Sequence, residues 1–164
     1  MFKITKKTGE EKVKWGWAMY DWANNVYSLV ITTAIFPLYY TQLTASGKCG
    51  KIVNGEVLFD HVNFFGTWYV NSQLYSYILG ASFLTVILLS PILSGIADFT
   101  GKKKLFMRIF TYMGAFGCLG LFFFDLEHIE WSLFPFYLAS VGFWGSVGFY
   151  NAFLPEIAPR EEHD

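Results

Sequence analysis

The sequence predicts an all-α membrane protein with four transmembrane helices and both termini in the cytoplasm. Composition, the length of the apolar segments and the placement of Lys and Arg predict it. The 164-residue chain is 54% hydrophobic, 21% aromatic and only 15% charged, whereas a soluble domain is roughly 45–50% apolar and about 25% charged. We therefore expect a multi-pass integral membrane protein, in the inner (cell) membrane if the source is bacterial.

Four segments are long and apolar enough to cross a bilayer, which takes about 20 mostly apolar residues. The predicted helices are 15–43, 73–97, 105–124 and 132–154. The first contains the most polar residues and gives the weakest signal. The third lacks the polar positions, repeated every three or four residues, of a helix in a soluble bundle. The first segment is too long for a signal peptide, and no small-residue cleavage pattern follows it.

The connections between the predicted helices differ in length. Residues 44–72 form a long external loop, in which Asn54-Gly55 predicts the turn of a small hairpin or lid. The other two connections are short, so the second, third and fourth helices are expected to be antiparallel neighbours. The last two helices carry glycines at every third position: Gly114, Gly117, Gly120, Gly142, Gly145 and Gly148. Small residues let helix backbones approach closely, so the pattern predicts packing, although the sliding contacts of a moving transporter would show it too.

The basic residues give the orientation, because cytoplasmic loops of membrane proteins carry an excess of Lys and Arg. One predicted side holds Lys3, Lys6, Lys7, Lys12, Lys14, Lys102, Lys103, Lys104, Arg108 and Arg160. The other side holds only Lys48 and Lys51. This asymmetry places both termini, and the loop between the second and third helices, in the cytoplasm.

A stripe of polar residues follows the first predicted helix. At 100° per residue one narrow face carries Asp21, Asn25, Ser28, Thr32 and Tyr39, flanked by Asn24. A charge deep in a bilayer costs about 2.5–3.5 kcal/mol on insertion scales, so this stripe is expected to face protein or water and to line a substrate pathway. The alternative is that these residues only hydrogen-bond to neighbouring helices, which contributes about 0.6 kcal/mol per bond.

The sequence lacks the motifs of several enzyme classes. No HExxH pattern occurs, and His61, His128 and His163 fall in predicted loops or the tail, which argues against an intramembrane metalloprotease. A serine nucleophile would have no histidine base at its depth, and there is no phosphate-binding loop. We therefore expect no enzyme, no cofactor or metal, and no nucleic-acid partner.

The stretch GIADFTGKKK resembles the signature loop between helices two and three of major facilitator superfamily transporters. Gly95, Asp98, Gly101, Lys102 and Lys103 match that signature in place and are followed by Lys104, whereas Phe99 stands where the family has a basic residue. YDWANNVYSLVITTAIFPLYY and YNAFLPEIAP are also similar to the vacuole-effluxer-like branch, which is related to autophagy-associated amino-acid effluxers. The resemblance implies that Asp98 helps to latch a cytoplasmic gate, that Gly101 makes the turn, and that the lysines hold the loop inside. The alternative is a loop whose lysines only set orientation.

The resemblance implies secondary transport of a small solute by alternating access, with amino acid efflux as one candidate. Asn151, Pro155 and Glu156 close the fourth helix, where Glu156 and Arg160 could form a rim salt bridge or a gate. Such transporters have two six-helix halves with the substrate between them. The expected partners are therefore the lipid bilayer, a small-molecule solute and the rest of a larger transporter, of which residues 1–164 are a partial N-terminal domain. The alternative function is a non-transporting four-helix membrane scaffold or accessory subunit.

Overall fold

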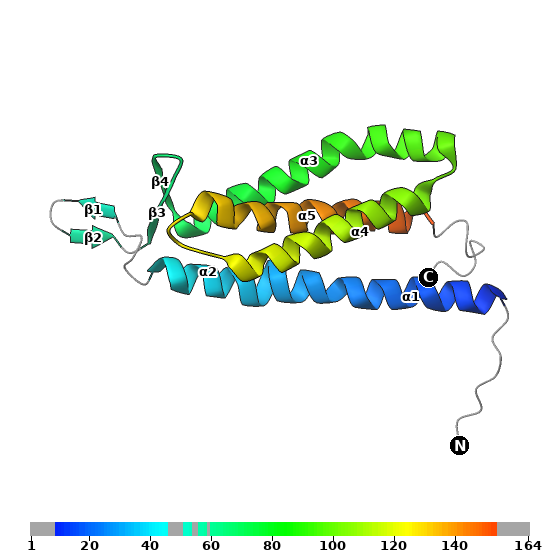
Figure 1. Cartoon of the computed structure of the whole chain (residues 1–164), viewed down its shortest axis with the longest axis horizontal. Coiled ribbons are helices and arrows are strands. Elements are labelled where there is room, and N and C mark those ends of the chain that lie inside the picture. The colour runs from blue at the N-terminus through cyan, green and yellow to red at the C-terminus, as the bar shows by residue number, and fades with distance from the viewer. Residues whose placement is uncertain (1–8, 46–50, 54–55, 59, 154–164) are drawn as a thin grey trace, which may run out of the picture.

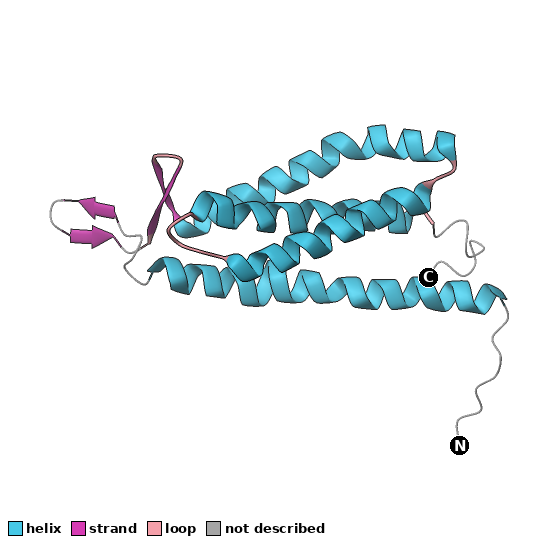
Figure 2. Cartoon of the chain, in the orientation of Figure 1, coloured by secondary structure: helices cyan, strands magenta, loops and turns pink. Residues whose placement is uncertain are grey.

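The structure is a computed structural model that describes residues 9–45, 51–53, 56–58 and 60–153. These residues are helical apart from two short hairpins and their connections (Figure 2). A long helical rod opens the chain and consists of α1 (Gly9–Tyr27), a π-helical segment (Ser28–Ala34) and α2 (Ile35–Ala45). The other helices are α3 (Asn71–Thr100), α4 (Lys103–Gly120, continued by a 3-10 turn at Leu121–Phe123) and α5 (Ile129–Asn151).

Helix α5 lies at the centre of the bundle and packs against both α3 and α4 (Figure 1). Most of its residues are buried, and Phe136, Ala139 and Ser140 have no exposed surface. By contrast, α3 and α4 bury only a few residues each. An apolar helix that is exposed over most of its surface is a poor element for water and a good one for lipid.

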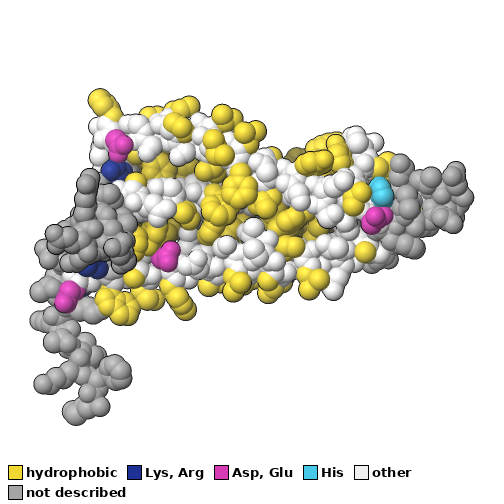
Figure 3. Space-filling view, turned by 180° about the vertical axis from the view of Figure 1, so that it is seen from behind, with side chains coloured by type: hydrophobic (Ala, Val, Ile, Leu, Met, Phe, Trp, Pro, Cys, Tyr) yellow, Lys and Arg dark blue, Asp and Glu magenta, His cyan; other side chains and the backbone are white. Residues whose placement is uncertain are grey.

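Within the described residues, three helices are long and apolar enough to cross a membrane: Asn71–Thr100, Lys103–Phe123 and Ile129–Asn151. Hydrophobic side chains cover much of the middle of the face drawn in Figure 3, and most charged side chains on it lie near its ends. The first predicted span is not among the three. Its helix begins in the charged stretch that follows Gly9, and the π-helical segment divides it.

Two antiparallel hairpins connect α2 to α3. Strands β1 (Lys51–Val53) and β2 (Glu56–Leu58) pair with Val53 opposite Glu56, which confirms the predicted hairpin, although Asn54-Gly55 itself lies outside the described residues. Strands β3 (His61–Phe64) and β4 (Thr67–Val70) form a second hairpin. Its two turn residues, Phe65 and Gly66, have φ angles of 48° and 80°, as two-residue hairpin loops require. The sequence did not predict this turn, because a bulky residue rarely adopts a positive φ.

The β3–β4 hairpin closes one end of the helix bundle. Val62 is buried there in a cluster with Tyr40, Leu74, Ile129 and Leu133. Buried Asn71 joins the elements: its Nδ2 donates to Thr44 Oγ1 at 2.9 Å, and its backbone N–H donates to the Asp60 carbonyl at 2.8 Å. The end of α2, the start of α3 and the start of α5 are therefore held together.

The predicted glycine packing is confirmed between α4 and α5. A Cβ built on Gly117 would lie 2.5 Å from the Ala139 backbone nitrogen, and one on Gly120 would lie 2.9 Å from the Pro135 ring. Gly142 packs against the backbone of Gly114, and Gly145 packs against the ring of Phe110. Gly148 differs, because nothing lies within 4 Å of its position. The two helices are therefore in contact at backbone level along most of the glycine pattern.

We expect Gly117→Ala to lower the free energy of unfolding by about 1–3 kcal/mol, because the added methyl group would overpack a backbone contact. Gly148→Ala is the matched control and should be neutral or slightly stabilising, since its Cβ meets open space and Ala favours helix. Thermal unfolding of the full-length protein in detergent measures both effects. Equal stability of the two variants would contradict the packing.

Candidate functional site

One face of α1 is fixed against α4 and α5 by aromatic rings. Trp17 stacks on Tyr150 with ring centroids 4.5 Å apart, and Tyr27 stacks on Phe143 at 4.6 Å. Two hydroxyl pairs add to these contacts: Tyr20 with Thr111 at 2.9 Å and Tyr27 with Ser140 at 3.0 Å. The sequence analysis missed this docking face. The spacing of Trp17, Tyr20 and Tyr27 is the signal that could have revealed it.

The predicted polar stripe begins on a different face of α1, which the described residues leave open. Asp21 and Asn25 are exposed, and Asn25 Nδ2 donates a hydrogen bond to Asp21 Oδ2 at 3.3 Å. Asn25 and half-buried Ser28 line an open surface groove of about 430 Å³. The structure thus brings Asp21, Asn25 and Ser28 to one side of α1, and we call these three residues the α1 polar face. The same groove is also lined by the exposed apolar side chains of Trp22, Val26 and Leu29.

Asn24 lies in a separate cleft. This cleft of about 190 Å³ is bounded by α1, α4 and α5. Its lining combines polar groups of Asn24, Tyr27, Thr111 and Ser146 with the small residues of the helix contact. The Tyr27 and Thr111 hydroxyls already have partners, and the Ser146 hydroxyl donates to the Phe143 carbonyl at 2.8 Å. The Asn24 amide is therefore the main polar group that this cleft offers to a small guest.

The π-helical segment Ser28–Ala34 divides the predicted stripe. A π-helix bonds residue i to i+5 and so has more residues per turn than an α-helix; here the Ile35 N–H donates to the Val30 carbonyl. Positions beyond Ser28 therefore rotate away from an extrapolation at 100° per residue. Thr32 is half-buried, and exposed Tyr39 lies against the ring of Phe124, 6.0 Å between centroids. Neither residue extends the α1 polar face as the periodicity predicted.

Side-chain hydroxyls satisfy the altered backbone of this segment. Thr33 Oγ1 lies 2.9 Å from both the Ser28 and Leu29 carbonyls. The Tyr75 hydroxyl of α3 donates to the Thr32 carbonyl at 2.7 Å. Pro37 follows in the next turn and has no N–H to offer the preceding turn. The irregular segment is thus held both from within the rod and from a neighbouring helix.

The predicted signature loop forms a tight turn between α3 and α4. Gly101 has φ 64° and ψ 17°, and its N–H donates to the Asp98 carbonyl at 3.3 Å while the Lys102 N–H donates to the Ala97 carbonyl at 3.1 Å. This pair of hydrogen bonds is typical of a Schellman cap, in which glycine is the preferred residue at the left-handed position. Gly95 has no neighbour within 4 Å.

The charges of this loop pair with each other. Exposed Asp98 forms an ion pair with Lys103, in which Oδ1 lies 3.1 Å from Nζ. Lys102 and Lys104 are exposed. The ion pair spans the turn, so within the described residues Asp98 is bound by its own loop.

The end of α5 lies near this loop and near α1 (Figure 1). Asn151 is exposed at the last position of the helix, whereas Pro155 and Glu156 lie outside the described residues. Trp17 Nε1 donates to the Tyr150 carbonyl at 3.5 Å, so α1 covers the last turn of α5. Among the described residues no group of three or more His, Cys, Asp or Glu side chains could hold a metal ion.

Comparisons with known proteins identify the family of the chain. A family model described as "Vacuole effluxer Atg22 like" matches residues 9–163. A protein of Bacillus subtilis (strain 168) named "Uncharacterized MFS-type transporter YxiO" is 34% identical over 145 residues, which cover 88% of this chain and 30% of that protein. The chain thus spans about 30% of the length of this relative. No solved structure matches the chain.

We expect Gly101→Ala to destabilise the loop by about 1–2 kcal/mol, because an L-residue with a side chain pays that amount in the left-handed region. Gly95→Ala is the matched control: it lies in regular helix with open space around it, so helix propensity predicts a gain of about 0.5–1 kcal/mol. Unfolding of both variants of the full-length protein in detergent, monitored by tryptophan fluorescence, measures the difference. Two variants of equal stability would show that the turn does not constrain the bundle.

Proposed function

The chain belongs to the Atg22-like vacuole effluxer family of the major facilitator superfamily, and on this premise we propose that it forms the first four spanning helices of a secondary transporter. The transporter moves a small solute by alternating access. The family match over nearly the whole chain is the observation that carries this proposal. The rest of the transporter, which this chain does not contain, supplies the opposite wall of the pathway.

We propose that the rod Gly9–Ala45 is the fourth spanning helix beside α3, α4 and α5. It runs alongside the bundle for most of its length (Figure 1). Its polar residues do not oppose this assignment, because aromatic docking covers one face and the α1 polar face would border protein or water. The beginning of α1, the α3–α4 loop and the end of α5 lie at one end of the bundle, opposite the hairpins. We propose that this end is cytoplasmic, because cytoplasmic loops of membrane proteins carry an excess of Lys and Arg and the α3–α4 loop is rich in lysine.

The α1 polar face is the proposed solute pathway. Asp21 offers a carboxylate and Asn25 an amide at one surface, and Asn24 offers a second amide in the separate cleft between α1, α4 and α5. An amino acid suits these groups: its ammonium can pair with Asp21 while its carboxylate accepts amide hydrogen bonds. Amino acids are therefore the substrate class that we propose, and efflux is the proposed direction of transport.

The π-helical segment is the proposed hinge of the rod. Irregular helical turns of this kind often occur at functional sites, and this one separates Asp21 and Asn25 from α2. Conversion to regular α-helix would change the register by one residue and rotate the α1 polar face relative to the hairpin end. The Tyr75 bond to the Thr32 carbonyl would hold the segment in its present form.

The ion pair of Asp98 with Lys103 is the proposed cytoplasmic latch. Because the two groups flank one turn at the protein surface, Asp98 can exchange Lys103 for a cation of the rest of the transporter without leaving a buried charge. Exposed pairs of this kind contribute only about 0–1 kcal/mol. The exchange would therefore be reversible on the scale of a transport cycle.

We expect Asp21→Asn in the full-length protein to reduce solute flux at least about tenfold, or about 1.4 kcal/mol in the free energy of the limiting step, without lowering the membrane level of the protein. Flux of a panel of amino acids into or out of proteoliposomes measures it. Glu127→Gln, which removes an exposed carboxylate from the α4–α5 connection, is the control. Unchanged flux in Asp21→Asn would remove Asp21 from the pathway, and a wild type that moves no solute would favour the scaffold function.

We expect Lys104→Cys and Phe65→Cys to lie on opposite sides of the membrane. In a cysteine-free background, an impermeant thiol reagent should label Phe65→Cys in intact cells and Lys104→Cys only after permeabilisation. Both positions are exposed, so access within the protein does not limit labelling. Labelling of both positions in intact cells would contradict the proposed sidedness.

A further inference from the structure

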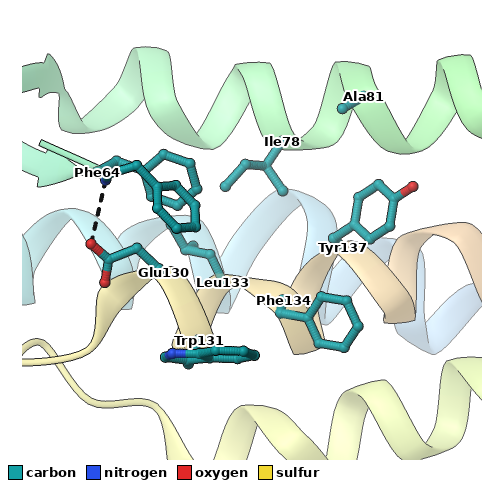
Figure 4. A pocket seen from close by; sticks show the side chains of 9 residues that line it. Phe64, Ile78, Ala81, Glu130, Trp131, Leu133, Phe134 and Tyr137 are labelled. Carbon is teal, nitrogen blue, oxygen red and sulfur yellow. Dashed lines mark hydrogen bonds between the residues drawn. The ribbon is translucent and has the colours of Figure 1, made fainter. Parts of the chain in front are cut away.

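A second groove lies between the β3–β4 hairpin, α3 and α5, away from the α1 polar face (Figure 4). Its volume is about 270 Å³, close to the lower end of the range for ligand pockets, roughly 300–1,000 Å³. Phe64 and Phe65 come from the hairpin, Ile78 and Ala81 from α3, and the remaining residues from α5. Apart from Glu130, every lining side chain is apolar or aromatic.

The groove runs along the helices. Phe64 and Glu130 lie at one end of it, and Ala81 and Tyr137 lie at the other (Figure 4). At a rise of about 1.5 Å per residue, the seven steps from Glu130 to Tyr137 span about 10 Å. If α3 and α5 cross the bilayer, the groove is parallel to the acyl chains of the surrounding lipids.

The polarity of the groove changes from one end to the other. Glu130 lies in the first turn of α5, at the edge of the apolar span, and its Oε1 accepts a hydrogen bond from the Phe65 N–H at 3.4 Å. At the inner end the Tyr137 hydroxyl is already paired with Thr85 Oγ1 at 2.7 Å. The groove thus presents a carboxylate at the hairpin end and an apolar inner end, which is the polarity of an amphiphile.

The charge at the mouth selects the headgroup. Among the residues that the structure describes, no Lys, Arg or His lines the groove. Phe65 and Trp131 flank the mouth and are 78% and 77% exposed, and aromatic faces attract cations. A cationic group therefore suits this mouth, whereas an anionic headgroup would meet the Glu130 charge.

We propose that this groove binds a phospholipid whose headgroup carries an ammonium group, as in phosphatidylethanolamine, with that ammonium at Glu130 and one acyl chain along Ile78, Phe134 and Tyr137. The proposal rests on insertion of α3 and α5 in a membrane and not on transport. The lipid would fill the space between α3 and α5 and fasten the β3–β4 hairpin to the bundle. The same lipid would thereby stabilise the end of the protein at which the hairpin packs.

Native mass spectrometry of the purified full-length protein, titrated with phosphatidylethanolamine, phosphatidylcholine or phosphatidylglycerol of identical chains, tests the proposal. We expect phosphatidylethanolamine to bind roughly fivefold more tightly than phosphatidylglycerol, the factor that corresponds to a partly exposed ion pair at the upper end of its range. Glu130→Gln should abolish this preference, whereas Glu127→Gln should retain it. Ala81→Leu should weaken binding of all three lipids, because it fills the inner end of the groove.

Gly80→Leu is the control for Ala81→Leu, since it also adds a leucine side chain to α3, at a position where a Cβ would meet nothing within 4 Å, and it should bind lipid like the wild type. Monodisperse elution in detergent shows that each variant is folded. Equal binding of the three lipids, a preference for phosphatidylglycerol, or a preference that survives Glu130→Gln would overturn the proposal. So would the absence of any bound lipid in the wild type, which would show that another part of the protein covers the groove. Flux measured on the same samples is independent, so loss of transport with retained lipid preference counts only against the proposed function.

Discussion

The arrangement depends on the backbone contact between α4 and α5. Without an aqueous drive to bring apolar helices together in lipid, close packing must supply the attraction, and here Gly117 against Ala139 and Gly142 against Gly114 allow it. This contact makes α5 the buried centre of the bundle and leaves the outer surfaces of α3 and α4 apolar and exposed. The first helix docks on the surface that this pair presents.

That docking separates two kinds of polar chemistry on one helix. The hydroxyls of Tyr20 and Tyr27 form hydrogen bonds with Thr111 and Ser140. These hydroxyls therefore hold α1 in place and already have hydrogen-bond partners. Asp21 and Asn25, on the adjoining face, bond only to each other among the contacts described. The sequence analysis considered hydrogen bonding to neighbouring helices as the alternative role of the polar stripe. In the structure this role fits Tyr20 and Tyr27 better than it fits Asp21 and Asn25. The tyrosines bond to other helices because their face of α1 packs against α4 and α5, whereas the face of Asp21 and Asn25 does not.

The sequence predicted the helical membrane class, the first hairpin and the glycine contact, because length, composition and small-residue spacing determine these features locally. It did not predict the π-helical segment, and so it extended the stripe to Thr32 and Tyr39 at the wrong period. That irregularity depends on Tyr75, which lies on another helix, and a periodicity analysis of one segment cannot include such a partner. The same limit explains Gly148, whose spacing matches the packing pattern but which has no neighbour to pack against, and the left-handed Phe65 of the second hairpin.

The exposed Asp21 constrains what must surround this chain in a membrane. A carboxylate at membrane depth costs about 2.5–3.5 kcal/mol when it faces lipid on insertion scales, and the weak contact with Asn25 at 3.3 Å returns only a fraction of that. If the rod spans the membrane as proposed, the α1 polar face therefore borders water or further protein and not lipid. By contrast, the groove beside Glu130 has its single charge at the edge of the span and an apolar interior, so lipid can cover it at no such cost. The two surfaces thus suit different surroundings: in the proposed transporter the α1 polar face would border the pathway, and the α3–α5 groove would border the bilayer.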